Sequence, residues 1–348
     1  MTNANSSLIY LLGDESQTAR TRALNWLSEG YARQTTIVEH IFQAWDEMGI
    51  REAFPEFPGL SHLPIASEQI VECCQRAGRM LVGHKLTATE TRCAGKLLEH
   101  VSQLPAAELQ PHLDLIKEIV AKSKIFFRVD VHAIENRIRL LGMAADELAS
   151  ELDKSLRSLI EDSNDLAANH RALHALEALR RQHPNYVDLS SVFATTPPSG
   201  GPSWLSFQVT LQSLLQLEEP GLESQLGQHL LDDRDSVFVP IVEALVRIAS
   251  PAAADALTEH FPVAPGHNRQ WIARGLQRIR VQGRADSIAA LRGAEQDYRL
   301  WLMLLVAEIR QFDPVSRNRV IADVARVGGS VPAVSDSMEI FSKLVSDV

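Results

Sequence analysis

The chain has 348 residues, of which 45% are hydrophobic, so it can bury a sizeable core and is not expected to be disordered. Only 6% of the residues are aromatic, whereas Leu, Ala, Glu, Arg and Gln abound; this usage is typical of helices, and we expect essentially no β-strand. A formal net charge of −10 argues against a general binder of polyanions, although it leaves room for a local basic patch.

Cysteine usage and hydropathy indicate the compartment. The three cysteines, Cys73, Cys74 and Cys93, do not form a disulfide framework, which favours a reducing environment. No run approaches the roughly 20 apolar residues that span a bilayer. Leu8–Leu12 is too short for the core of a signal peptide. We therefore expect a soluble, cytoplasmic protein without membrane association.

Residues 1–183 are predicted to be an irregular helical region of degenerate repeats, interrupted by a breaker-rich loop at Phe54–Pro64. The expected helices are Gln17–Gly30, Thr35–Met48, Ser67–Val82, Ala88–Leu104, Leu109–Lys122, Val131–Leu141, Asp146–Ile160 and Asp165–Arg181. Residues 184–202 are rich in Pro, Gly and Ser and are predicted to be a linker or long loop, where we place the domain boundary.

Residues 203–327 repeat their apolar pattern with a fixed period, which predicts four HEAT-like helical hairpins. The matching sets are Leu214, Leu245 and Leu276; Leu217, Ile248 and Ile279; Leu226, Leu257 and Ile288; and Pro220 with Pro251. A fourth hairpin fits if the period shortens by one position, which aligns Ile272 with Leu302, Leu276 with Val306 and Ile279 with Ile309. Residues 328–348 add one amphipathic helix that is expected to cap the exposed end.

The segment Asp235–Pro251 carries an aspartate, an early valine, an Ala-Leu pair and a helix break. It resembles a HEAT-like repeat of the short bacterial type, although Phe238 stands where such repeats often have an arginine. The resemblance implies an all-α, armadillo-like α-solenoid, a right-handed superhelix of helical hairpins that is irregular in its N-terminal half. Such proteins mostly present surfaces to partners.

The strongest local charge lies between His267 and Arg292, where six arginines stand against Asp286 alone, a local net charge of +5. Arg274 and Arg278 are predicted to point away from the apolar face of their helix, free to meet a partner. Trp271 and Trp301 are predicted neighbours in adjacent repeats, as are His229 and His260, which are one full period apart. All six are candidate partner-binding residues; the alternatives are ordinary solvated residues for the arginines, core packing for the tryptophans and partial burial for the histidines.

Motifs for chemistry are weak. His170, His174 and Glu177 share a helical face that could bind a metal, but no third strong ligand is fixed by the sequence, and solvated histidines are the simpler interpretation. Cys73 and Cys74 lie in an apolar helix and are interpreted as buried small hydrophobes rather than a redox pair. No phosphate loop, nucleophile elbow or other catalytic or cofactor motif is present, so none is assigned.

The sequence therefore predicts a non-enzymatic scaffold that binds another protein. A nucleic-acid-binding protein similar to HEAT-like DNA glycosylases is the main alternative, disfavoured by the net charge. A His-metal enzyme similar to HEAT-like hydroxylases is a third, but the His-Glu pairs of that family occur here only in reverse order, as at Glu39-His40. A role like that of bilin lyases with related short repeats stays open.

Overall fold

The computed structural model describes residues 4–55, 63–82, 87–102, 104–122, 130–162, 165–183, 211, 221–327 and 331–345. Throughout these ranges the chain consists of α-helices, short 3₁₀ turns and connections without a strand, which confirms the all-α prediction for them. Among the helices so described, none combines the length and the apolar character that a membrane crossing requires.

The N-terminal helices follow the predicted order closely. They are α1 (Ala4–Tyr10), α2 (Gln17–Glu29), α3 (Thr36–Met48), α4 (Ile50–Ala53), α5 (Ser67–Val82), α6 (Ala88–Ser102), α7 (Ala106–Leu109), α8 (Leu113–Lys122), α9 (Val131–Arg139), α10 (Ala145–Glu161) and α11 (Leu166–Gln182). The helix predicted over 109–122 is divided, with a 3₁₀ turn at Gln110–His112, because Pro111 cannot donate a backbone hydrogen bond. Helices α1 and α4 were not predicted, being too short to show a period.

The C-terminal helices alternate with short connections. They are α13 (Leu222–Gly227), α14 (Asp235–Ile248), α15 (Pro251–His260), α16 (Gly266–Arg278), α17 (Ala285–Ala294), α18 (Tyr298–Ile309), α19 (Arg317–Val327) and α20 (Pro332–Val345). Side chains cap several of them: Ser250 accepts from Ala253 N at 3.1 Å and Asp297 from Arg299 N at 2.8 Å. The predicted linker and most of the first C-terminal helix, Leu214 and Leu217 included, lie outside the described residues.

Burial repeats along α14, α16 and α18. The buried positions Val237, Ile241, Val242, Ala244 and Leu245 recur one predicted period later at Asn268, Ile272, Ala273, Gly275 and Leu276. They recur again at Leu300, Leu304, Leu305, Ala307 and Glu308, after an interval that is longer by one position. The predicted shortening of the period is therefore wrong for this step. The connection Ile279–Arg284 between α16 and α17 is longer than Ala249–Ser250 between α14 and α15, which lengthens the interval.

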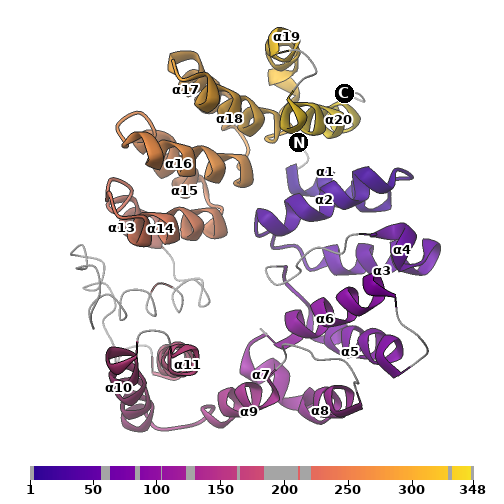
Figure 1. Cartoon of the computed structure of the whole chain (residues 1–348), viewed down its shortest axis with the longest axis vertical. Helices are drawn as coiled ribbons and strands as arrows, with labels where there is room; N and C mark the ends of the chain where they lie inside the picture. The colour runs from indigo at the N-terminus through magenta and orange to yellow at the C-terminus, as the bar shows by residue number, and fades with distance from the viewer. Residues whose placement is uncertain are drawn as a thin grey trace.

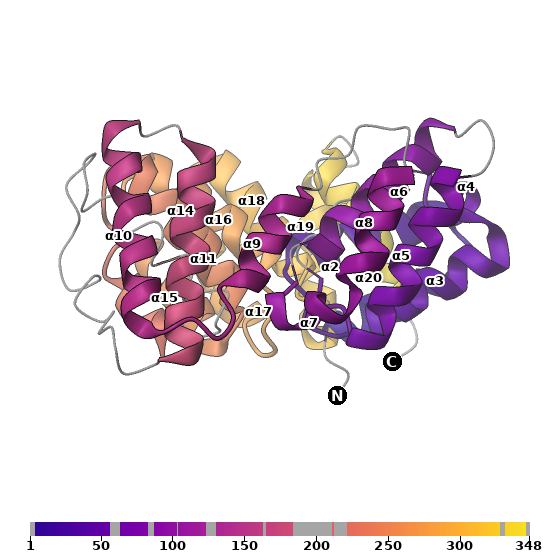
Figure 2. The same cartoon turned by 90° about the horizontal axis from the view of Figure 1, so that it is seen from below.

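Buried side chains form two large hydrophobic cores. The terminal core combines residues of 8–134 with residues of 305–345, and the middle core combines residues of 159–307. Figure 2 shows the corresponding division into two groups of helices, with α10, α11 and α14 to α17 on one side and α3 to α6 and α8 on the other. Helix α18 contributes to both, with Leu304 in the middle core and Leu305 in the terminal core.

The two ends of the chain pack together. Figure 1 shows α1 to α9 running down one side of the molecule and α13 to α20 running up the other, so that α20 lies beside α1 and α2. Ion pairs join Arg22 to Asp336 at 2.6 Å and Lys343 to Asp14 at 2.7 Å, and the rings of Trp26 and Phe312 stack at 6.0 Å. Helix α20 thus packs against α18 on one side and against the first helices on the other. The C-terminal helices therefore do not end in a free surface there.

Candidate partner-binding surface

The predicted basic patch is largely neutralised inside the fold. Most of its arginines bond to acidic or carbonyl oxygens that lie outside the window His267–Arg292. The partners are Glu295 for Arg269 (3.0 Å), Glu243 for Arg278, Asp255 for Arg284 (2.7 Å), Glu308 for Arg292 (2.8 Å) and the Trp26 carbonyl for Arg280 (2.7 Å). The local charge of +5 therefore does not appear as a basic surface, because acidic and carbonyl groups from outside this window compensate most of its arginines.

Arg278 is not free, contrary to the prediction. Its Nη1 pairs with Glu243, its Nε donates to the Glu29 carbonyl at 2.9 Å, and its guanidinium lies 5.5 Å from the Tyr31 ring centroid. The residue thereby joins α16 to α14 and to the C-terminal end of α2. It stabilises the contact between these distant segments, and 22% of its side-chain surface stays exposed.

Arg274 differs from its neighbour one turn away. It is exposed, and no ion pair reaches it from the part of the chain that the structure describes. Its guanidinium carbon lies 4.8 Å from the centroid of the Trp271 ring, within the range of a cation–π interaction. The half-buried Trp271 packs against the middle core and so holds the arginine in place.

Trp271 belongs to a row of half-buried apolar side chains across three helices. In the register set by the buried positions, Pro240 of α14, Trp271 of α16 and Met303 of α18 are equivalent, and each is partly exposed. Figure 1 shows these three helices side by side, and Gln277 Nε2 donates to the Met303 carbonyl at 2.9 Å. We call the surface of Val239, Pro240, Trp271, Arg274 and Met303 the α14–α16–α18 face.

Trp301 does not share this face. It packs against the terminal core, where Tyr298 stacks on it with centroids 6.1 Å apart and Arg292 lies 5.2 Å from its ring. The expectation that Trp271 and Trp301 are equivalent neighbours is therefore wrong, because it depended on the shortened period. In the observed register Met303 is the counterpart of Trp271.

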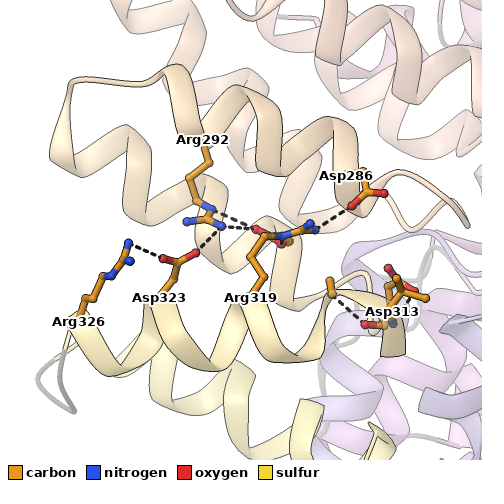
Figure 3. Close-up of polar contacts among 9 residues, drawn as sticks. Asp286, Arg292, Asp313, Arg319, Asp323 and Arg326 are labelled. Atoms are coloured by element: carbon orange, nitrogen blue, oxygen red, sulfur yellow. Dashed lines mark hydrogen bonds and ion pairs between the residues drawn. The ribbon is translucent and has the colours of Figure 1, made fainter.

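Arg292 belongs to a buried charge network that joins α17, α18 and α19 (Figure 3). Glu308, with no exposed surface, accepts from Arg292 Nε at 3.0 Å and from Arg319 Nε at 2.7 Å. Asp323 pairs with Arg292 at 2.7 Å and with Arg326 at 3.0 Å. Sequence reasoning missed this network, although a single carboxylate within the apolar run of Leu300–Ile309 was a signal that it is paired.

The predicted histidine pair is not a surface feature. His229 is only 3% exposed, in the turn after α13, and His260 donates from Nδ1 to the Ala256 carbonyl at 2.8 Å within its own helix. Both histidines lie near Gly227. His229 follows it by two residues, and a Cβ placed at Gly227 would lie 3.9 Å from Cε1 of the His260 ring. Because His229 is buried, the two histidines do not form a continuous row of exposed rings on the surface.

His170, His174 and Glu177 are not arranged as the ligands of a metal ion in the described structure. His174 Nδ1 lies 3.8 Å from Glu177 Oε2, and burial lowers the pKa of His174. His170 is exposed, with its ring 6.3 Å from that of His174. Over the described ranges, no three His, Cys, Asp or Glu side chains are grouped to hold a metal ion.

A small cavity of about 60 Å³ adjoins this pair, between α7, α9 and α11. Its charged groups already bond to protein: Arg137 donates to the Ser102 and Leu104 carbonyls at 2.7 and 2.6 Å, and Arg181 to Glu177 at 3.2 Å. A volume of this size holds about two waters. The two arginines therefore support the packing of α9 and α11.

Comparison with known proteins adds no identification. No family model matches the chain, and neither the curated proteins nor the solved structures contain a match to it.

Proposed function

We propose that the chain is a non-enzymatic scaffold of the HEAT-like α-solenoid type, which binds another protein through the α14–α16–α18 face. The observation that carries this proposal is the exposed guanidinium of Arg274, held over Trp271 among half-buried apolar side chains of three neighbouring helices. Arginine and tryptophan are the side chains that most often dominate the energy of protein interfaces.

The repeat character of the array supports the architectural part of the proposal. Equivalent buried positions recur at nearly constant intervals in α14, α16 and α18. In a right-handed superhelix of hairpins each unit shields the apolar side of the previous one, and equivalent surface positions then form rows across the units. The row of Pro240, Trp271 and Met303 is such a row.

The chemistry of the face favours an acidic partner protein over nucleic acid. Its apolar row suits the core of an interface, and Arg274 supplies a positive charge that the described neighbours do not neutralise. Nucleic acid would need several cations in one patch, because each phosphate contact releases counterions. The internal pairing of the other arginines removes those cations from the surface.

The test compares capture of protein partners from a native lysate by the wild-type chain and by Arg274→Glu. Arg274 is exposed, so reversal of its charge should leave the fold intact while weakening capture by about thirtyfold, the factor expected for a hot-spot residue. Lys154→Glu, an equally exposed reversal on α10, is the matched control and should capture as the wild type does.

Trp271→Ala should weaken capture of the same proteins, and thermal unfolding of the variant shows whether the fold is retained. Equal capture by the wild type and Arg274→Glu would remove the α14–α16–α18 face from the proposal. Binding of a labelled DNA duplex that falls steeply between about 50 and 200 mM salt would favour the nucleic-acid alternative.

A further inference from the structure

A second surface feature lies far from the α14–α16–α18 face, where α5 packs beside α8 (Figure 2). The two helices form an open groove with a volume of about 380 Å³. This volume is at the lower end of the roughly 300–1,000 Å³ found for binding sites in proteins. The groove is therefore large enough to accept a side chain of a partner.

The floor of the groove is apolar. Gly78 of α5 has no side chain, and a Cβ placed there would lie 3.4 Å from Ile119 Cγ1, so the two helices approach closely at this point. Ile119 is 6% exposed and belongs to the terminal core, and the half-buried Leu115 packs against that core one turn earlier in α8. The depression exists because a glycine occupies the place of a larger residue.

The rim of the groove is cationic. Arg79 is exposed and forms no close ion pair within the described ranges, although the carboxylate of Asp46 on α3 attracts it from a longer distance. Lys122 pairs with Glu118 across one turn of α8, so these two charges compensate each other. The lining thus has a net charge of +1 in a chain whose net charge is −10.

We propose that this groove is a docking site for an acidic segment of a partner protein, which inserts one apolar side chain over Gly78 and places a carboxylate beside Arg79. The apolar floor favours the inserted side chain, and the exposed Arg79 with the net positive lining favours acidic flanking residues. The site goes beyond the α14–α16–α18 face, because it is built by the other core of the molecule and does not depend on Trp271 or Arg274.

The experiment uses the full chain and an array of peptides with one Leu, Ile, Met or Phe at the centre. The flanks are Glu and Asp in one set, Ser and Gly in a second, and Lys and Arg in a third. Wild-type protein should retain the acidic set most strongly, and Arg79→Glu should weaken that binding by about tenfold while strengthening binding of the basic set. Lys154→Glu should leave the profile unchanged.

Gly78→Ala separates binding from folding. Alanine is the better helix residue and its Cβ meets only ordinary contacts, so the variant should be at least as stable as the wild type. The added methyl group raises the floor and should weaken peptide binding. Failure of the wild type to prefer the acidic set, or an identical profile for Arg79→Glu, would overturn the proposal. Arg274→Glu should leave the array profile intact, so this result stands apart from the test of the α14–α16–α18 face.

Discussion

Arg274 and Arg278 lie one turn apart on α16, and their surroundings give them different roles. Glu243 and the Glu29 carbonyl hold Arg278, whereas Arg274 contacts only the Trp271 ring among the described interactions. Both residues are arginines of the same helix. The difference arises because α2, which is far away in the chain, ends beside Arg278 and not beside Arg274.

Single residues were predicted well where local pattern determines burial. Cys73 and Cys74 are each at most 1% exposed, which confirms their interpretation as small core residues, and Cys93 is buried as well. They were predictable because Cys73 and Cys74 follow Ile70 and Val71 on an apolar helical stripe. The surroundings of three other residues were not predicted, because they are formed by other helices: His229, Arg278 and Trp301.

The cysteines give a prediction about pH. Burial raises the pKa of the Cys74 thiol from an ordinary value of 9.0 to about 11, and it raises those of Cys73 and Cys93 as well. At pH 8 the Cys74 thiolate should be about a hundredfold scarcer than in an exposed cysteine. A thiol reagent should therefore react very slowly with the native protein and rapidly with all three thiols in urea. A fast native reaction of one thiol would contradict this.

The same shift has a defined sign for stability. The native state holds the thiol proton more tightly than the unfolded state, so the contribution of Cys74 is complete below pH 9 and is lost as the pH rises toward about 11. The free energy of unfolding, measured in urea, should accordingly fall over this range. Cys74→Ala should reduce the slope of that fall.

At the scale of the elements, α18 is the helix that joins the two cores. It follows α14 and α16 in its pattern of buried positions, yet Glu308 stands where those helices have Leu245 and Leu276. The carboxylate is compensated by Arg292 and Arg319, which come from the helices on either side in sequence. The network therefore fixes α17 and α19 against α18.

Glu308→Gln should destabilise the protein strongly. The amide cannot neutralise the two guanidinium groups, and removal of one partner from a buried ion pair typically costs about 3–5 kcal/mol. The measurement is urea-induced unfolding, with the exposed Glu259→Gln on α15 as the control, which should change the free energy by less than about 0.5 kcal/mol. A Glu308→Gln effect as small as that of the control would show that the network contributes little to stability.

At the scale of the whole molecule, the terminal core makes the two ends of the chain interdependent. Phe341 of α20 is 1% exposed in a core that also contains Leu8, Leu24 and Leu27. The ion pairs of Arg22 with Asp336 and Glu339 lie at the same contact. Loss of packing at α20 should therefore also destabilise the first helices of the chain, α1 and α2.

Phe341→Ala tests this dependence. The cavity should cost about 3–5 kcal/mol, and hydrogen exchange should accelerate in α1 and α2 as well as in α18 and α20. Ile321→Ala, at a position that is 46% exposed on α19, is the control and should leave exchange in α1 and α2 unchanged. Acceleration confined to residues after 298 would show that the two ends unfold separately.

The local sequence pattern was sufficient to predict the helices but not to predict which residues form the molecular surface. Helical periodicity and breakers predicted α5 to its end residues and α14 to α18 in order, because these signals act within a few turns. The repeat interval after α16 was misjudged, since connection length is set by how helices pack and the breakers do not reveal it. Of the residues that form the α14–α16–α18 face, the sequence indicated only Trp271 and Arg274 as candidates for partner binding.

The sequence by itself determined that the chain is helical and which of its stripes are buried, because helix formation and burial depend on neighbours three and four positions away. Only the tertiary structure decided which charges remain at the surface. Glu243 and the end of α2 reach their arginines through contacts between elements that are not adjacent in the chain, and such contacts leave no local pattern. The packing of α20 against the first helices is of the same kind, and it makes the two ends of the molecule one core.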